Sequence, residues 1–416
     1  MEKTGIDPAG AAIAGAAETA GAPSDAQLSL PARFEEFGNA RKEGFLRVKE
    51  LKENGGRIAG TFCTFTPLEI LDAAGFTPVS LCGMSDETIP DAEAHLPKNL
   101  CPLIKSSYGF AVSDKCPYTY FSDLIVGETT CDGKKKMYEL LGRIKPVHVL
   151  HLPQGLPGDG AEGDGGYALD MWVRELRRFI AALEGRFGVT VTEDALRAAA
   201  RERNEERRAR LDLMRIQRLD PPPALGMQLY TTLEGAGFLF DTRQRIERLE
   251  SLRRDLMARY DAGERPVDAG AKRILVTGCP IGGVLQKTVG AIERDGRAAV
   301  VCFENCSGIK AAFQMVDADA PDIVGAIARR YLQIGCSVMT PNARRAELLR
   351  ELVREYRVDG IVEVDLQSCT PYTVESWEVR GLAGELGVPY LSLETDYSQS
   401  DRGQLETRVE AFLEML

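Results

Sequence analysis

Histidine is scarce in this sequence. Only His95, His148 and His151 occur among 416 residues, and none of them lies in a motif with a cysteine. The chain also has no G-x-S-x-G turn, the elbow that exposes a nucleophilic serine in α/β hydrolases. The sequence therefore gives no support to a Ser-His-Asp hydrolase.

Positive charge is in deficit as well. The 51 Lys and Arg residues face 62 Asp and Glu, a net charge of −11, and no basic stripe with interleaved aromatics occurs. This balance argues against a nucleic-acid surface. No apolar run approaches the roughly 20 residues of a membrane span, and the first thirty residues lack the charged start and apolar core of a signal peptide. We therefore expect a cytoplasmic protein with a disordered tail over residues 1–30.

Cysteine, by contrast, is abundant, with ten residues. Thiols stay reduced in the cytoplasm, where a cysteine-rich chain more often binds metal or catalyses a reaction than forms disulfides. Several of the cysteines follow an apolar, β-branched run and precede a Pro, a Gly or a helix-like stretch, a pattern typical of the carboxyl end of a parallel strand. These strand-end cysteines are Cys63, Cys279, Cys306 and Cys369.

The alternation of strand and helix patterns predicts an α/β fold with mainly parallel sheets. We expect two Rossmann-like or flavodoxin-like domains that face a shared cleft, over residues 31–160 and 271–416, joined by a helical segment over 161–270. The expected strands lie near 58–62, 78–82, 124–126, 147–150, 273–277, 298–303, 360–365 and 390–393.

Two patterns in the helical segment are informative. Ile246, Leu249, Leu252 and Leu256 form one apolar stripe of an amphipathic helix. The charge run RERNEERRAR at 201–210 mixes signs at helical spacing, which favours a solvated helix face over a docking surface.

The cysteines of the two α/β regions correspond in position: Cys63 with Cys279, Cys101 with Cys336, and Cys131 with Cys369. If both sheets point their carboxyl ends toward one cleft, thiolates from both halves converge there. Three other cysteines are interpreted differently. Cys82 and Cys302 lie in apolar strand patterns and are expected to be small buried hydrophobic residues, and Cys116 stays unassigned.

Such a group of thiolates predicts a metal cluster. Soft thiolates select iron–sulfur clusters, zinc or copper(I). Spacings of about thirty residues do not resemble the short C-x-x-C pairs of structural zinc or ferredoxin-type sites, but they suit a cleft built by several loops. Cys131 also precedes the lysine run 134–136 at a helix start, where backbone N–H groups and cations would stabilise an electron-rich cluster.

The motifs around these cysteines are long. They read GTFCTFTPLEI, LPKNLCPLIKSSYGFAVSDKCPY, YFSDLIVGETTCDGKKKMYE, ILVTGCPIGG, FENCSGIKAAF, LQIGCSVMTPNARR, LQSCTPYTVES and LETDYSQSDRGQLETRVEAF. From about residue 34 to the C-terminus the chain resembles the 2-hydroxyacyl-CoA dehydratase superfamily, most closely its branch of double-cubane-cluster anaerobic reductases.

This resemblance implies an [8Fe-9S] double cubane, two [4Fe-4S] units joined by a sulfide, with three cysteines on each unit. The motifs shared across the superfamily assign the first set to the first half of the chain. This set is Cys63, Cys101 and Cys131. In the second half, FENCSG favours Cys306, whereas the symmetry of the halves favours Cys279. The ligands that we assign are Cys63, Cys101, Cys131, Cys306, Cys336 and Cys369, with Cys279 as the alternative.

Proton donors are less clearly marked. Thr370 stands where the related sequences tend to carry His after the cysteine, so we expect the proton source to differ here. Four carboxylates near the cysteine motifs could relay protons to a substrate, or could equally be helix caps or solvated charges. These candidates are Glu69, Glu128, Glu304 and Glu375.

The resemblance also implies a separate, ATP-hydrolysing iron–sulfur activator that supplies low-potential electrons, and this chain has no G-x-x-x-x-G-K-[ST] loop of its own. We therefore expect a homodimeric iron–sulfur reductase of small molecules. One alternative is a 2-hydroxyacyl-CoA dehydratase subunit with a single [4Fe-4S] cluster, which would need only the first cysteine set. The other is a non-catalytic electron carrier.

Overall fold

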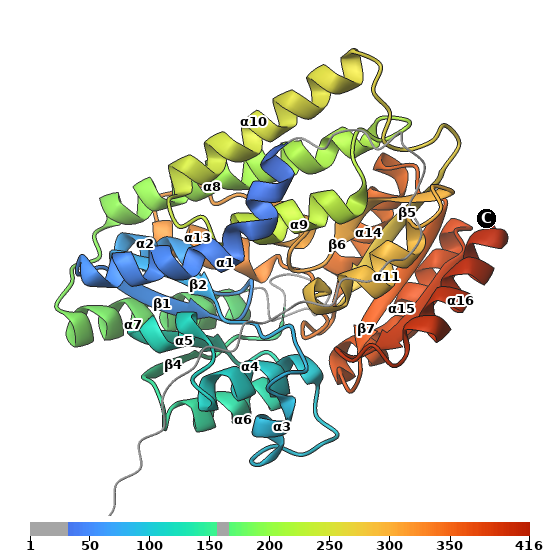
Figure 1. The fold of residues 1–416 in the computed structure, drawn as a ribbon. Helices are drawn as coiled ribbons and strands as arrows, with labels where there is room; N and C mark the ends of the chain where they lie inside the picture. Colours follow the sequence, from blue (N-terminus) through green and yellow to red (C-terminus); the bar gives the residue numbers. More distant parts are fainter. Residues whose placement is uncertain (1–31, 156–165) are drawn as a thin grey trace, which may run out of the picture. The chain divides into compact units, whose positions relative to one another are not determined.

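The computed structural model describes residues 32–155 and 166–416, and Figure 1 colours them along the sequence. The expected tail over 1–30 lies outside the described residues. The first α/β part contains α1 (Ala32–Glu53), β1 (Arg57–Thr61), α2 (Leu68–Ala73), β2 (Phe76–Ser80), α3 (Ile89–Glu93), α4 (Pro102–Val112), α5 (Pro117–Phe121), β3 (Leu124–Glu128), α6 (Asp132–Leu141) and β4 (Val147–Leu150).

Helices fill the middle of the chain, and a second α/β part follows. The helices are α7 (Tyr167–Phe187), α8 (Glu193–Arg215), the 3-10 turn η1 (Ile216–Arg218), α9 (Gly226–Ala236) and α10 (Thr242–Asp261). The second part contains β5 (Lys272–Gly278), the 3-10 turn η2 (Gly282–Val284), α11 (Leu285–Ile292), β6 (Ala298–Glu304), α12 (Ile309–Ala312), α13 (Ile323–Leu332), α14 (Ala343–Glu355), β7 (Gly360–Leu366), α15 (Thr370–Leu386), β8 (Tyr390–Thr395) and α16 (Arg402–Glu414).

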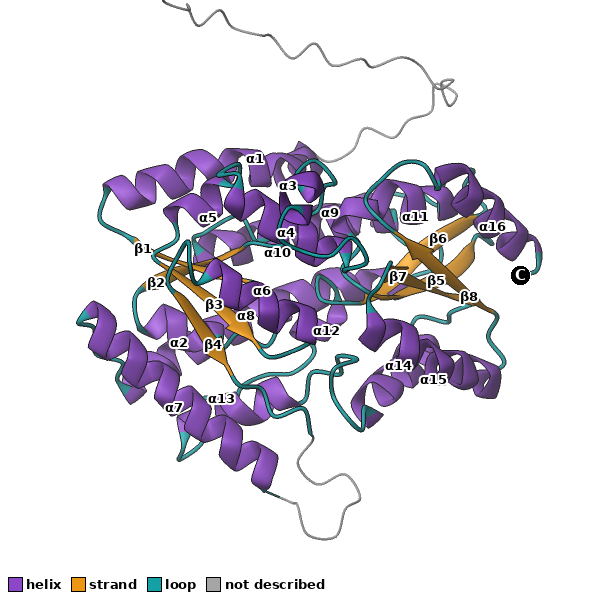
Figure 2. Ribbon diagram, turned by 90° about the horizontal axis from the view of Figure 1, so that it is seen from below, coloured by secondary structure: helices purple, strands orange, loops and turns teal. Residues whose placement is uncertain are grey.

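The two sheets have the same topology. Their strand orders are β2-β1-β3-β4 and β6-β5-β7-β8, and every neighbouring pair runs parallel. Helices cover both faces of each sheet in Figure 2. The predicted α/β fold with two parallel sheets is therefore confirmed. In such open sheets, ligands bind at the carboxyl ends of the strands.

The second sheet is the more deeply buried. All seven residues of β6, AAVVCFE, and all seven of β7, GIVEVDL, are buried, as expected for parallel strands with helices on both faces. These strands also carry polar residues into the interior, namely Glu304, Glu363 and Asp365. Buried carboxylates need partners, so their contacts matter for the site.

The apolar stripe predicted for the middle segment is confirmed, because Ile246, Leu249, Leu252 and Leu256 are the buried apolar residues of α10. The solvated face predicted for 201–210 is wrong for one side of α8. Arg203 and Arg207 are buried there, since they pair with the carboxylates of α2 described below. Among the described residues, no helix combines the length and apolarity that a membrane span needs.

Candidate metal centre

A cavity of about 1180 Å³ lies where loops from both sheets meet. All seven cysteines that the sequence singled out as ligand candidates line it. Cys82 lines it as well; it packs against the core as expected, but the expectation that it is fully buried is wrong, because it is only partly buried. Cys302 is buried within β6 as expected, and Cys116 caps α5 outside the cavity. The lining cysteines are Cys63, Cys82, Cys101, Cys131, Cys279, Cys306, Cys336 and Cys369.

The shared topology explains this gathering. In each sheet the first three strands end within three residues of a cysteine. The equivalent strands carry equivalent cysteines: β1 and β5 precede Cys63 and Cys279, β2 and β6 precede Cys82 and Cys306, and β3 and β7 precede Cys131 and Cys369. Cys82 follows β2 as Cys306 follows β6, and this match in position is the signal that could have identified Cys82 as a cavity-lining residue.

Helix N-termini point at three of the thiols. Cys101, Cys131 and Cys369 are the N-cap residues of α4, α6 and α15. Backbone amides of the following turn oppose the rise in pKa of each thiol, those of Leu103 and Ile104 for Cys101 and those of single residues for the other two. Free N–H groups and the positive end of the helix dipole both favour a thiolate over a thiol.

The thiols contact one another across the two halves of the chain. Cys101 interacts electrostatically with Cys369, and Cys369 interacts electrostatically with Cys279. Cys63 interacts electrostatically with Cys306 and Cys336. The two halves therefore contribute to each group of thiols, so the cysteines do not separate by half.

Burial raises the pKa of the Cys63, Cys131 and Cys279 thiols, and that of Cys306 to about 11. Lys134, which also lines the cavity, opposes the shift at Cys63. Without a cation the thiols are thus protonated at neutral pH. Metal binding would displace these protons, because the ligand is the thiolate.

No three His, Cys, Asp or Glu side chains in residues 32–155 and 166–416 converge as they would on a single metal ion. Ligands of a multi-iron cluster bind different iron atoms, so they surround a space instead of meeting at a point. Eight thiols around one cavity fit the second arrangement. They do not form the compact tetrahedral site of a structural zinc ion.

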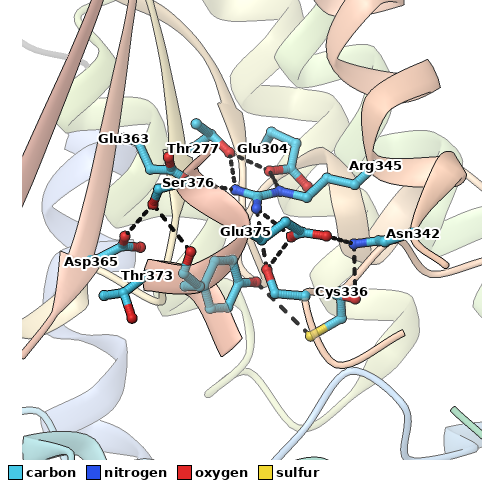
Figure 3. A network of polar contacts seen from close by, with 12 residues as sticks. Thr277, Glu304, Cys336, Asn342, Arg345, Glu363, Asp365, Thr373, Glu375 and Ser376 are labelled. Carbon is cyan, nitrogen blue, oxygen red and sulfur yellow. Dashed lines mark hydrogen bonds and ion pairs between the residues drawn. The ribbon is translucent and has the colours of Figure 1, made fainter. Parts of the chain in front are cut away.

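Figure 3 shows the network that holds the loop at Cys336. Asn342 donates to the Cys336 carbonyl oxygen at 3.0 Å and to Glu375 at 2.6 Å. The Tyr372 hydroxyl lies 4.0 Å from the Cys336 sulfur and accepts a hydrogen bond from Lys310 at 2.9 Å. Because Lys310 occupies the oxygen as a donor, the Tyr372 proton is available for the sulfur.

None of the four candidate carboxylates is among the residues lining the cavity. Three are held by cations: Glu69 by Arg207 at 2.5 Å, Glu304 by Lys310 at 2.9 Å and Glu375 by Arg345 at 2.6 Å. They are therefore neither simple caps nor solvated charges.

The fourth carboxylate, Glu128, is fully buried and accepts a hydrogen bond from Thr66. Its Oε2 atom has no hydrogen-bond partner among the described residues. Burial raises the pKa of Glu128 to about 7, although Lys134 opposes this. Of the four candidates, Glu128 is the one suited to hold a proton at neutral pH. Thr370, the position where a histidine was expected, does line the cavity.

Comparison of the sequence with known proteins identifies one family. The family described as 2-hydroxyglutaryl-CoA dehydratase, D-component, matches residues 63–416. The Escherichia coli (strain K12) protein named "Putative dehydratase subunit YjiM" is 49% identical to this chain over 388 residues. The match covers 93% of this chain and 98% of YjiM.

More distant relatives include both dehydratase and reductase subunits. The (R)-phenyllactyl-CoA dehydratase beta subunit of Clostridium sporogenes is 22% identical over 370 residues, 89% of this chain and 94% of that protein. One of the subunits of benzoyl-CoA reductase from Thauera aromatica is 22% identical over 353 residues, 82% of this chain and 85% of that protein.

Proposed function

Because this chain belongs to the 2-hydroxyglutaryl-CoA dehydratase D-component family, within the 2-hydroxyacyl-CoA dehydratase superfamily, we propose that it is an iron–sulfur reductase of small molecules. The cofactor would be an [8Fe-9S] double cubane, which stores and delivers low-potential electrons. Electrons would come from a separate ATP-hydrolysing activator. The observation that carries this proposal is the gathering of eight thiols from both sheets around one cavity.

The donor set fits such a cofactor. Thiolates are the ligands of iron–sulfur clusters, and the cavity offers more of them than one cubane with three cysteines would use. The proposed ligands remain Cys63, Cys101, Cys131, Cys306, Cys336 and Cys369, with Cys279 as the alternative.

The contacts of Cys279 and Cys306 bear on that alternative. Cys279 interacts electrostatically with Cys369 and donates a hydrogen bond to Asp365 at 3.9 Å. Cys306 interacts with Cys63 and Cys336. Both thiols are therefore placed to bind, each beside a different group of cysteines, and substitution of each is needed to choose between them.

The surrounding groups would stabilise negative charge on the ligands. The amides at the starts of α4, α6 and α15 face Cys101, Cys131 and Cys369, Lys134 acts on Cys63, and Tyr372 can donate to Cys336. Hydrogen bonds and positive charge around the sulfur atoms raise the reduction potential of a cluster and make electron uptake easier.

The test is to purify the protein without oxygen and to count iron and acid-labile sulfide per chain. About eight irons per chain, as the double cubane implies, would support the proposal. A Cys336→Ser variant should lose iron, and Cys279→Ser and Cys306→Ser compared side by side identify the sixth ligand as the one whose loss lowers the iron count.

A second candidate function is a dehydratase subunit with a single [4Fe-4S] cluster. The dehydratase role given in the name of YjiM, together with its 49% identity, favours this reading. It predicts about four irons per chain, bound by the first cysteine set alone. A 2-hydroxyacyl thioester that changes the paramagnetic spectrum of the reduced protein would favour it further.

A third candidate, an electron carrier without catalytic activity, would consume no substrate when reduced.

The homodimer also stays a prediction, which light scattering of the anaerobic protein tests directly.

A further inference from the structure

The helices that follow β3 and β7 are built alike. These strands are equivalent in the two sheets, and each leads to a cysteine, Cys131 or Cys369, that is the N-cap residue of the next helix. In both helices the backbone amide of the third residue opposes the rise in pKa of that cysteine. The side chain of the third residue differs, because it is Lys134 in α6 and Tyr372 in α15. The same scaffold therefore carries a cation in one half of the chain and a phenol in the other.

Lys134 brings its charge to thiols of the first half. It lines the cavity, and its Nζ donates to the carbonyl oxygen of Phe62 at 2.9 Å, directly before Cys63 in the chain. A carbonyl oxygen is neutral, so it satisfies the donor without cancelling the charge. Burial raises the pKa of the Cys63 and Cys131 thiols, and the charge of Lys134 opposes this rise at both.

Glu128 offsets part of this charge. Burial raises the pKa of Glu128 to about 7, so its carboxyl group is only partly ionised at neutral pH. At Cys63 the effect of Lys134 is larger than that of Glu128. Burial also disfavours the charged form of Lys134, but the neighbouring Tyr138 and Cys63 hold its pKa above the ordinary value. A net positive charge therefore remains beside the thiols of the first half.

Tyr372 brings no charge to Cys336, a proposed ligand in the second half. Its hydroxyl lies 4.0 Å from the Cys336 sulfur and accepts a hydrogen bond from Lys310 at 2.9 Å. Lys310 is itself paired with Glu304 at 2.9 Å, so its charge is cancelled. Burial raises the pKa of Tyr372 well above its usual value, so the phenol is neutral at neutral pH.

The effect of Lys134 is uneven across the cavity. At Cys63 it is the largest influence on the pKa after burial. Burial raises the pKa of Cys306 to about 11, and there both Lys310 and Cys336 act more strongly than Lys134. The positive charge of Lys134 therefore favours the first cysteine set over the second. The second set comprises the remaining proposed ligands, Cys306, Cys336 and Cys369.

An added electron is a full negative charge, which a cation stabilises more than a neutral hydrogen-bond donor does. We propose that Lys134 gives the cubane on the first set a higher reduction potential than the cubane on the second set, so that the first electron resides on the first cubane. The second cubane, once reduced, is then the stronger reductant of the two. This inference rests on the proposed function, since it requires two cubanes.

The experiment is an anaerobic electrochemical titration of the full chain, purified without oxygen and containing about eight irons. The paramagnetic spectrum is recorded at each potential. We expect two one-electron midpoints. Repulsion between the two electrons separates such midpoints even in equivalent cubanes, so substitutions are needed to assign each midpoint to a cubane.

Lys134→Gln keeps a donor for the Phe62 carbonyl oxygen and removes the charge. It should lower the equilibrium constant for uptake of the first electron at least tenfold, which is about 59 mV for a one-electron couple. Lys134→Arg, which keeps the charge, should restore the first midpoint. Lys135→Gln is the matched control, because the neighbouring Lys135 is 45% exposed and pairs with Asp132 at 2.6 Å. It should leave both midpoints unchanged.

Tyr372→Phe tests the second cubane. It should lower the second midpoint and leave the first unchanged. Equal first midpoints in Lys134→Gln and Lys135→Gln, or a fall of the first midpoint in Tyr372→Phe, would overturn the inference. If Lys134→Gln binds no iron, the result for Tyr372→Phe decides alone.

Failure of this inference differs from failure of the proposed function. About four irons per chain would refute the double cubane itself. About eight irons per chain, with a first midpoint that does not respond to Lys134→Gln, would refute only the order of reduction.

Discussion

Arg345 is a buried cation whose loss should strongly lower the free energy of unfolding. Its side chain is 1% exposed and contacts three carboxylates: Glu375 at 2.6 Å, Glu363 at 2.8 Å and Glu304 at 3.3 Å. It also donates to Thr277 at 2.9 Å. Figure 3 shows the guanidinium at the centre of this network.

Arg345→Met keeps the apolar stem and removes the charge. Glu304 would retain Lys310 and Glu375 would retain Asn342, but Glu363 would keep only the neutral Tyr390 hydroxyl, at 2.5 Å. A fully buried carboxylate would thus lose its cation. Breaking a buried ion pair by removing one partner costs about 3–5 kcal/mol, so we expect the free energy of unfolding to fall by that amount.

The assay is urea denaturation of the iron-free protein, followed by fluorescence. Arg344→Met is the matched control, because the neighbouring Arg344 is 34% exposed and pairs with Glu347 one helical turn away. This substitution should cost less than about 1 kcal/mol. Arg345→Met combined with Glu363→Gln should recover part of the loss. Equal effects of Arg345→Met and Arg344→Met would refute the reasoning.

Two further predictions concern single groups. Burial raises the pKa of Glu234 to about 7, and its Oε1 has no hydrogen-bond partner among the described residues. The free energy of unfolding should therefore fall as pH rises from about 4.5 to 7. Glu234→Gln should remove this dependence and add about 3 kcal/mol at pH 8 in thermal unfolding. A variant that keeps the wild-type pH profile would contradict this. Tyr372→Phe removes the hydroxyl that lies 4.0 Å from the Cys336 sulfur, so the cofactor should become harder to reduce. Its midpoint potential should fall by about 59 mV in a one-electron titration for each 1.4 kcal/mol of stabilisation lost. An unchanged midpoint potential would show that this contact does not act on the cofactor.

Local sequence patterns predicted the sheets and seven of the cysteines that line the cavity. β-branched runs followed by cysteines identified the strand ends at Cys63, Cys279, Cys306 and Cys369, because a parallel strand buried on both faces has a strong local signal. The apolar stripe of α10 was predictable for the same reason: the helix period places its buried residues on one side.

The errors arose where partners lie far away in sequence. The run 201–210 has the same mixed charges whether it faces water or protein, and its burial depends on Asp72 and Glu69, more than a hundred residues earlier. Cys82 likewise sits in an apolar pattern that fits a core residue. Only the pairing of β2 with β1 places it at the rim of the cavity.

The central claim is that thiols from both sheets hold one cofactor. The measurement that tests it most directly is an anaerobic crystal structure with anomalous scattering recorded at the iron edge. The account predicts one continuous group of iron sites in the cavity, bonded to cysteines that follow strands of both sheets, such as Cys63 and Cys369. Iron bonded to cysteines of one sheet alone, or no iron between the two sets, would contradict it.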